Sequence, residues 1–226
     1  MECAVFFNLD NTLTRMNRDF GDIYIEAVER AGLEEVKDSY EEYKSGFFRF
    51  FQDGWAFPRR QAMDSLCRDR DCYDPEKVEK FAEVWEELEA ESLDLKPGVE
   101  NALEALSSKG FGIGILSNGT NRLQNLKLEK LGIKKYFDAV VVSAGEGIRK
   151  PQKDIFDRAR ELLKADRYVM VSHLLRDDVI AARRADFEAV WISEKEPEQG
   201  IPEDVALRVG SFEELPGAVE NICSAK

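Results

Sequence analysis

Histidine and cysteine are scarce in this chain, which has one histidine and four cysteines among 226 residues. Four residues separate Cys67 from Cys72, a spacing that differs from the Cys-x-x-Cys of redox and zinc sites. We therefore expect no zinc site. The four cysteines are expected to be buried or surface thiols, with a local Cys67–Cys72 disulfide as the alternative.

Long apolar runs and basic blocks are missing as well. The apolar runs are short, far below the ~20 residues that a membrane helix needs. The N-terminus leads directly into a strand pattern, without the basic flank and cleavage site of a secretion signal. We expect a cytoplasmic protein with no membrane partner. The net charge of −13 also argues against nucleic acid as a partner, and the oligomeric state stays open.

Strand and helix patterns alternate along most of the chain. Short apolar runs predict buried strands at residues 4–7, 111–116, 139–142, 168–171 and 189–192. Helical patterns separate the later strands from one another. This alternation predicts an α/β fold with a doubly wound parallel sheet and helices on both faces.

The pattern stays helical over one long stretch that follows the first strand. Apolar residues recur at helical spacing in residues 19–31, 36–53, 56–68 and 75–92. We expect residues 16–92 to form a helical cap domain, inserted into a core domain of residues 1–15 and 93–226. The aromatic residues of the cap are expected to form its own core, with a substrate pocket as the alternative; they are Phe47, Phe48, Phe51, Trp55 and Phe57.

Polar residues follow the predicted strands at their carboxyl ends, where open α/β sheets bind ligands. Asn8-Leu9-Asp10-Asn11-Thr12 comes directly after the first strand, and Ser117-Asn118-Gly119 follows the second. Lys150 precedes a proline after the third strand, and Ser172-His173 with Asp178 follows the fourth. Each segment alone could be an ordinary turn, helix cap or surface charge. Their order along the chain favours one shared site.

Together the four segments resemble the motifs of the haloacid dehalogenase (HAD) superfamily. The first resembles Asp-x-Asp-x-Thr after an apolar strand, and the second a Ser or Thr that holds phosphate oxygens. Lys150 matches the lysine of the third motif, and Asp178 matches the second aspartate of the fourth. The resemblance covers the whole chain, and the helical insert is similar to a type-1 cap. It implies a Rossmann-like core and a magnesium-dependent phosphatase for a phosphorylated small molecule.

The resemblance also implies a role for each matched residue. Asn8, Asp10 and Lys150 fall at catalytic positions, with Asp10 as the general acid and base. Magnesium would be bound at the positions of Asn8, Asp10, His173 and Asp178. The substrate phosphate would be held at Asn11, Thr12, Ser117, Asn118, Gly119 and Lys150.

Two of these residues depart from the family pattern. Asn8 stands where the family has its nucleophilic aspartate, and a neutral amide is a poor nucleophile. His173 replaces a metal-binding aspartate, and imidazole suits zinc, copper or nickel better than magnesium. We therefore predict a protein that resembles a phosphatase but is inactive or severely impaired, with magnesium binding compromised.

Two alternatives to this hypothesis stay open. One is an active phosphatase that uses another metal through His173, Asp10 and Asp178. The other is a metal-free regulatory pseudoenzyme that binds phosphate or a protein. We also predict that His173 takes the metal position and forms a hydrogen bond with Asp10 or Asp178, which would favour the charged imidazole.

Overall fold

The computed structural model describes residues 2–54, 57–194 and 207–225. Its centre is a six-stranded sheet in the order β5-β4-β1-β6-β7-β8, in which all neighbouring strands are parallel. The five predicted strands are confirmed, and β8 is an additional edge strand. The bounds are β1 Cys3–Phe7, β4 Gly112–Ser117, β5 Ala139–Val142, β6 Arg167–Ser172, β7 Glu188–Ile192 and β8 Leu207–Val209.

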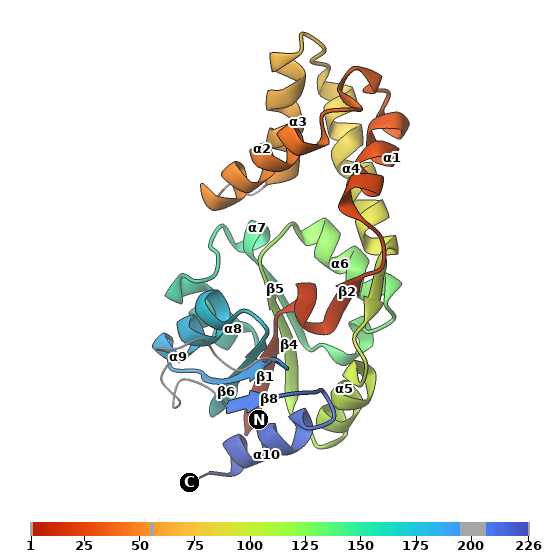
Figure 1. Ribbon diagram of the computed structural model, residues 1–226. Helices are drawn as coiled ribbons and strands as arrows, with labels where there is room; N and C mark the ends of the chain where they lie inside the picture. Colours follow the sequence, from red (N-terminus) through yellow and green to blue (C-terminus); the bar gives the residue numbers. More distant parts are fainter. Residues whose placement is uncertain (1, 55–56, 195–206, 226) are drawn as a thin grey trace.

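Helices cover both faces of the sheet, as Figure 1 shows. Successive residues of β1 alternate between the two faces: Val5 and Phe7 pack in one buried cluster with α5 and α10, whereas Ala4 and Phe6 pack in another with α8 and α9. The predicted doubly wound architecture is therefore confirmed. The helix bounds are α5 Val99–Ser108, α6 Asn121–Lys130, α7 Ser143–Glu146, α8 Lys153–Leu162, α9 Ala181–Arg184 and α10 Leu215–Ser224.

A glycine allows the two central strands to fit together. Gly114 of β4 lies beside Phe6 of β1 in the ladder. A Cβ atom on Gly114 would lie 2.4 Å from the Phe6 ring, so only glycine leaves room for this aromatic side chain. The close approach packs β1 and β4 at the centre of the sheet, next to the end that carries the candidate site.

The helical insert forms a separate layer above the sheet (Figure 1). In the described part of the insert, the α-helices bury a cluster of their own; they are α1 Phe20–Ala31, α2 Tyr40–Gln52, α3 Pro58–Asp69 and α4 Pro75–Glu91. The second helix starts at Tyr40, later than predicted, because a short 3-10 turn over Glu34–Val36 precedes it. Where the chain enters and leaves the cap, β2 (Thr14–Met16) pairs antiparallel with β3 (Leu93–Leu95). The domain boundaries at residues 15/16 and 92/93 stay a prediction.

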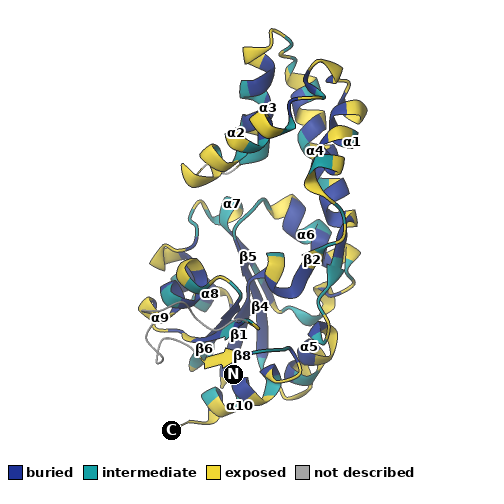
Figure 2. Ribbon diagram, in the orientation of Figure 1, coloured by how far each residue is buried: buried dark blue, intermediate teal, exposed yellow. Residues whose placement is uncertain are grey.

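The aromatic core of the cap differs from the predicted one. Tyr24, Tyr43, Phe81 and Trp85 fill it, with contacts between neighbouring rings. Phe47 is partly buried against this cluster. The prediction is wrong for three residues near the end of α2 and the start of α3, which are exposed: Phe48, Phe51 and Phe57. Trp55 lies outside the described residues. Figure 2 shows exposed residues along α2 and α3.

The cysteines also differ from expectation. Cys3 in β1 and Cys223 in α10 form a disulfide, so the prediction of four thiols is wrong for this pair. The two residues are 220 positions apart in the sequence, but their Cα atoms lie 6.1 Å apart because β1 and α10 pack in the same buried cluster. Cys67 and Cys72 are free thiols. Within the described ranges, no helix is both long and apolar enough to cross a membrane.

Candidate functional site

The predicted site residues gather at the carboxyl ends of three adjacent strands. Asn8 directly follows β1, Ser117 ends β4 and Ser172 ends β6. Since β1 lies between β4 and β6, these three positions lie next to one another at the carboxyl end of the parallel strands. The chain thus builds its candidate site at the sheet edge where α/β folds of this type bind ligands.

Lys150 lies in the loop after α7, and its side chain reaches the carboxyl ends of the strands. The Asn118 side chain fixes the lysine backbone, since its Oδ1 accepts from Lys150 N at 3.0 Å and its Nδ2 donates to Lys150 O at 3.1 Å. The Lys150 ammonium then donates to Asn8 Oδ1 at 3.1 Å and to Asp178 Oδ2 at 2.9 Å. Lys150 and Asp178 are both buried, so their ion pair is desolvated and well enclosed.

Hydrogen bonds on both sides fix the orientation of the Asn8 amide. Its Nδ2 donates to Asp10 O at 2.8 Å and to Thr12 Oγ1 at 3.0 Å, while its Oδ1 accepts from Lys150. A carboxylate has no hydrogen to donate, so it would set an oxygen against the carbonyl of Asp10. The surroundings of residue 8 therefore suit an amide.

His173 contacts Thr12 and neither of the two predicted carboxylates. Its Nδ1 lies 2.9 Å from Thr12 Oγ1, and its backbone N donates to the same oxygen at 3.2 Å. Burial lowers the pKa of His173, and the nearby Lys96 lowers it further, although Asp178 acts in the opposite direction.

The prediction of a charged His173 bonded to Asp10 or Asp178 is therefore wrong. The Asp178 carboxylate is already occupied by the Lys150 ammonium and by the Ser172 hydroxyl, which donates to its Oδ2 at 2.6 Å. Thr12 Oγ1 accepts from Asn8 and from the backbone of His173, so its own hydrogen can be donated to the imidazole. A neutral ring accepts that bond.

Both carboxylate oxygens of Asp10 have partners on α6. Its Oδ1 lies 2.6 Å from Lys127 Nζ, and its Oδ2 accepts from Gln124 Nε2 at 2.7 Å. Lys127 Nζ also lies 2.6 Å from Glu89 Oε1, and Glu89 Oε2 accepts from Arg59 at 2.5 Å. A chain of alternating charges thus runs from the site into the cap.

This chain of charges shifts the pKa values of its buried members. Burial alone would raise the pKa of Glu89, but Arg59 and Lys127 outweigh it and lower the pKa to about 2. Burial alone would lower the pKa of Lys127, but Asp10 and Glu89 outweigh it and raise the pKa. Both groups are therefore charged at neutral pH.

Three residues of the site, Gln124, Lys127 and Glu89, were not predicted from the sequence. Gln124 and Lys127 lie on the buried stripe of α6, together with Leu123 and Leu128. Two polar residues at helical spacing on an otherwise apolar stripe are a signal that could have found them.

The loop after β4 packs tightly against Gln124. Gln124 Nε2 lies 2.9 Å from Ser117 Oγ, and Gly119 N donates to Ser143 Oγ at 3.0 Å. Gly119 has a φ of 146°, and a Cβ atom there would lie 2.8 Å from Gln124 Nε2. Glycine is thus required at this position of the second motif.

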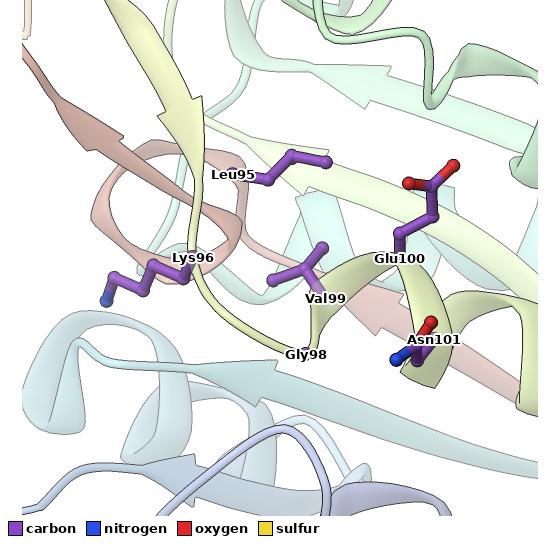
Figure 3. Close-up of a pocket in the computed structure, with 6 residues that line it drawn as sticks. All are labelled: Leu95, Lys96, Gly98, Val99, Glu100 and Asn101. Carbon is purple, nitrogen blue, oxygen red and sulfur yellow. The ribbon is translucent and has the colours of Figure 1, made fainter.

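Lys96 lines a hollow of about 200 Å³ at the start of α5. Figure 3 shows the Lys96 side chain pointing away from the other lining residues, Leu95, Gly98, Val99, Glu100 and Asn101. Its ammonium donates to the carbonyl oxygen of Asn11, which has left-handed backbone with a φ of 56°. The hollow is therefore adjacent to the first motif, but its lining does not include the strand-end residues.

The residues present do not fit a magnesium ion. Magnesium demands octahedral oxygen coordination. The carboxylate of Asp10 faces Lys127, Asp178 faces Lys150, and His173 offers a nitrogen directed at Thr12. In the part of the chain that the structure describes, no group of three or more His, Cys, Asp or Glu side chains is arranged to hold a metal ion.

The profile of the haloacid dehalogenase-like hydrolase family matches residues 4–186, most of the chain. The chain belongs to this family. A solved 2-haloacid dehalogenase from Pseudomonas syringae pv. tomato DC3000 has the same fold, with a TM-score of 0.74 and 22% identity over 98% of this chain and 100% of that chain. The predicted membership is therefore confirmed.

Curated relatives of this HAD protein include a nucleotidase and several proteins named as phosphatases. The pyrimidine 5'-nucleotidase YjjG of Escherichia coli is 33% identical over 60% of this chain and 61% of its own length, so the match spans less than two thirds of that protein. The glyceraldehyde 3-phosphate phosphatase of Pyrococcus abyssi is 28% identical over 83% of this chain and 80% of its own length. The ribulose-1,5-bisphosphate 5-phosphatase of Halopiger xanaduensis is 28% identical over 87% of both.

Proposed function

We propose that this HAD protein binds a phosphorylated small molecule at the strand-end site without a metal ion and hydrolyses it very poorly or not at all. The substrate class is supported by the names of curated relatives, which are a pyrimidine 5'-nucleotidase, a glyceraldehyde 3-phosphate phosphatase and a ribulose-1,5-bisphosphate 5-phosphatase. HAD phosphatases generally use magnesium, but the donor groups of this site do not fit that ion. A cytoplasmic location and the lack of a nucleic acid partner remain part of the proposal.

The amide environment of Asn8 carries this proposal. Residue 8 stands at the nucleophile position of the family, and its amide donates two hydrogen bonds that a carboxylate could not make. An amide oxygen that accepts from Lys150 has little tendency to attack phosphorus. The loss of covalent catalysis is thus supported by the surroundings of Asn8 as well as by its identity.

Phosphate binding is supported by the groups that surround Asn8. The Lys150 ammonium lies at the carboxyl end of β1, and Ser117 lies at the end of the neighbouring strand β4. Backbone amides in the turn after Asn8 complete a donor set for phosphate oxygens. Asp178 neutralises Lys150 in the free protein, so a bound phosphate would share this ammonium with Asp178.

Calorimetry with inorganic phosphate tests the proposal. The protein is titrated in the presence of a chelator, together with a Lys150→Met variant and a Lys153→Met control. Lys153 pairs with Asp157 on the surface of α8, so its loss should leave the site intact. We expect metal-free binding by the wild type and by Lys153→Met, and its loss in Lys150→Met.

Binding that appears only after a divalent ion is added would overturn the metal-free site. It would favour a phosphatase that recruits an ion through the predicted metal residues. Equal binding by the wild type and Lys150→Met would instead place the phosphate elsewhere. A circular dichroism spectrum of each variant verifies that it is folded.

A further inference from the structure

A buried ion pair joins the candidate site to the cap. Helix α6 of the core packs against helix α4 of the cap, and charged pairs link them along their length. Arg122–Glu86 and Lys130–Glu91 include exposed partners, whereas both side chains of Lys127–Glu89 are buried. Lys127 is also the residue that contacts Asp10.

We propose that Lys127 is a positioning residue that couples the cap to the candidate site. Its ammonium lies 2.6 Å from Asp10 Oδ1 and 2.6 Å from Glu89 Oε1, so one group holds a site carboxylate and a cap carboxylate at once. A displacement of α4 therefore displaces Asp10. This coupling is independent of the proposed function, since it requires neither hydrolysis nor phosphate binding.

The cap end of this link is firmly fixed. Glu89 Oε2 accepts from Arg59 at 2.5 Å and from Trp85 Nε1 at 2.9 Å. The Arg59 guanidinium lies over the Trp85 ring at 4.7 Å and over the Phe47 ring at 4.6 Å. Glu89 is thus held by the aromatic core of the cap and moves with it.

The site end is fixed as well. Gln124 Nε2 holds the second oxygen of Asp10, so both carboxylate oxygens have a partner on α6. If the cap moved alone, Lys127 would stay buried beside a single carboxylate, and Glu89 would lose its pairing with Lys127. Separation of buried opposite charges is costly, because neither regains full hydration. The arrangement of lowest energy after a cap movement keeps both ion pairs, so the Lys127 ammonium moves with Glu89 and the Asp10 carboxylate moves with Lys127.

The test perturbs the cap and observes the site. The side-chain amide of Gln124 donates to Asp10, so its NMR chemical shifts report on the position of that carboxylate. The side-chain amide signal of Gln124 in a nitrogen–proton correlation spectrum is assigned by its loss in Gln124→Met. We compare Glu89→Gln with Glu91→Gln, which removes the exposed partner of Lys130 on the same two helices. We expect Glu89→Gln to displace the Gln124 signal and Glu91→Gln to leave it in place.

A double variant shows whether the effect passes through Lys127. In a Lys127→Met background, the further change Glu89→Gln should no longer displace the Gln124 signal. Where Glu89→Gln does not fold, Glu89→Asp retracts the charge by one methylene and should displace the same signal. The coupling is overturned if the cap variants leave the Gln124 signal where Glu91→Gln leaves it. It is also overturned if the displacement persists undiminished without Lys127.

Discussion

Replacement of Glu89 by glutamine should destabilise the protein far more than its location on the cap suggests. The pKa of Glu89 falls from its ordinary value of 4.5 to about 2, because Arg59 and Lys127 outweigh the effect of burial. At about 1.4 kcal/mol per pH unit, the charged form contributes roughly 3 kcal/mol to the free energy of unfolding. Breaking a buried ion pair by removal of one partner typically costs about 3–5 kcal/mol, which agrees in size.

Urea unfolding at pH 7 measures this loss. With a slope of about 3 kcal/mol per molar urea, Glu89→Gln should lower the midpoint by about 1 M. Glu91→Gln is the control, and its exposed pair with Lys130 should contribute no more than about 1 kcal/mol.

The pH dependence follows from the lowered pKa of Glu89. Its contribution is complete above pH 4.5 and is lost as the pH falls toward 2, so the gap between Glu89→Gln and the wild type should close in acid. Equal losses of stability in Glu89→Gln and Glu91→Gln at neutral pH, or a gap that is independent of pH, would refute this role of Glu89.

Two further predictions concern the site itself. His173 should titrate below pH 6.5 in a proton NMR experiment, where the single histidine of the chain gives an unambiguous signal. Lys96→Met should raise the pKa of His173. A midpoint above 6.5 in the wild type would contradict the role of burial and Lys96. The purified chain should hydrolyse p-nitrophenyl phosphate with magnesium at a negligible rate, because Asn8 has no attacking carboxylate. Turnover within tenfold of the ~10 s⁻¹ of ordinary enzymes would refute this expectation.

The core of the fold could be predicted from sequence because its strands are buried on both faces. Runs such as residues 4–7 and 139–142 are continuously apolar, and helical patterns separate the later ones. The missed elements lack that signal. β8 has two exposed residues out of three, and the β2–β3 pair joins positions that are 77 to 81 residues apart. The disulfide between Cys3 and Cys223 likewise depends on tertiary packing.

The location of the site could also be predicted from the sequence, since the strand ends and the order of the motifs can be read directly along the chain. The contacts within the site were not. The sequence places His173 near Asp178, but it does not reveal that Lys150 and Ser172 already occupy that carboxylate. The partner of Asp10 lies on α6, which carries no family motif. The partner that each buried group takes in a hydrogen bond depends on the tertiary structure, which the sequence motifs do not specify.

We propose that Asn8 and His173 remove the magnesium-dependent phosphatase chemistry from this HAD fold. The most direct test measures magnesium-dependent hydrolysis of a phosphomonoester by Asn8→Asp, His173→Asp and the double variant. We expect measurable activity in the double variant and much less in either single variant, because the groups act as a unit. A double variant that binds magnesium in a crystal structure but shows no measurable hydrolysis would contradict this role of Asn8 and His173.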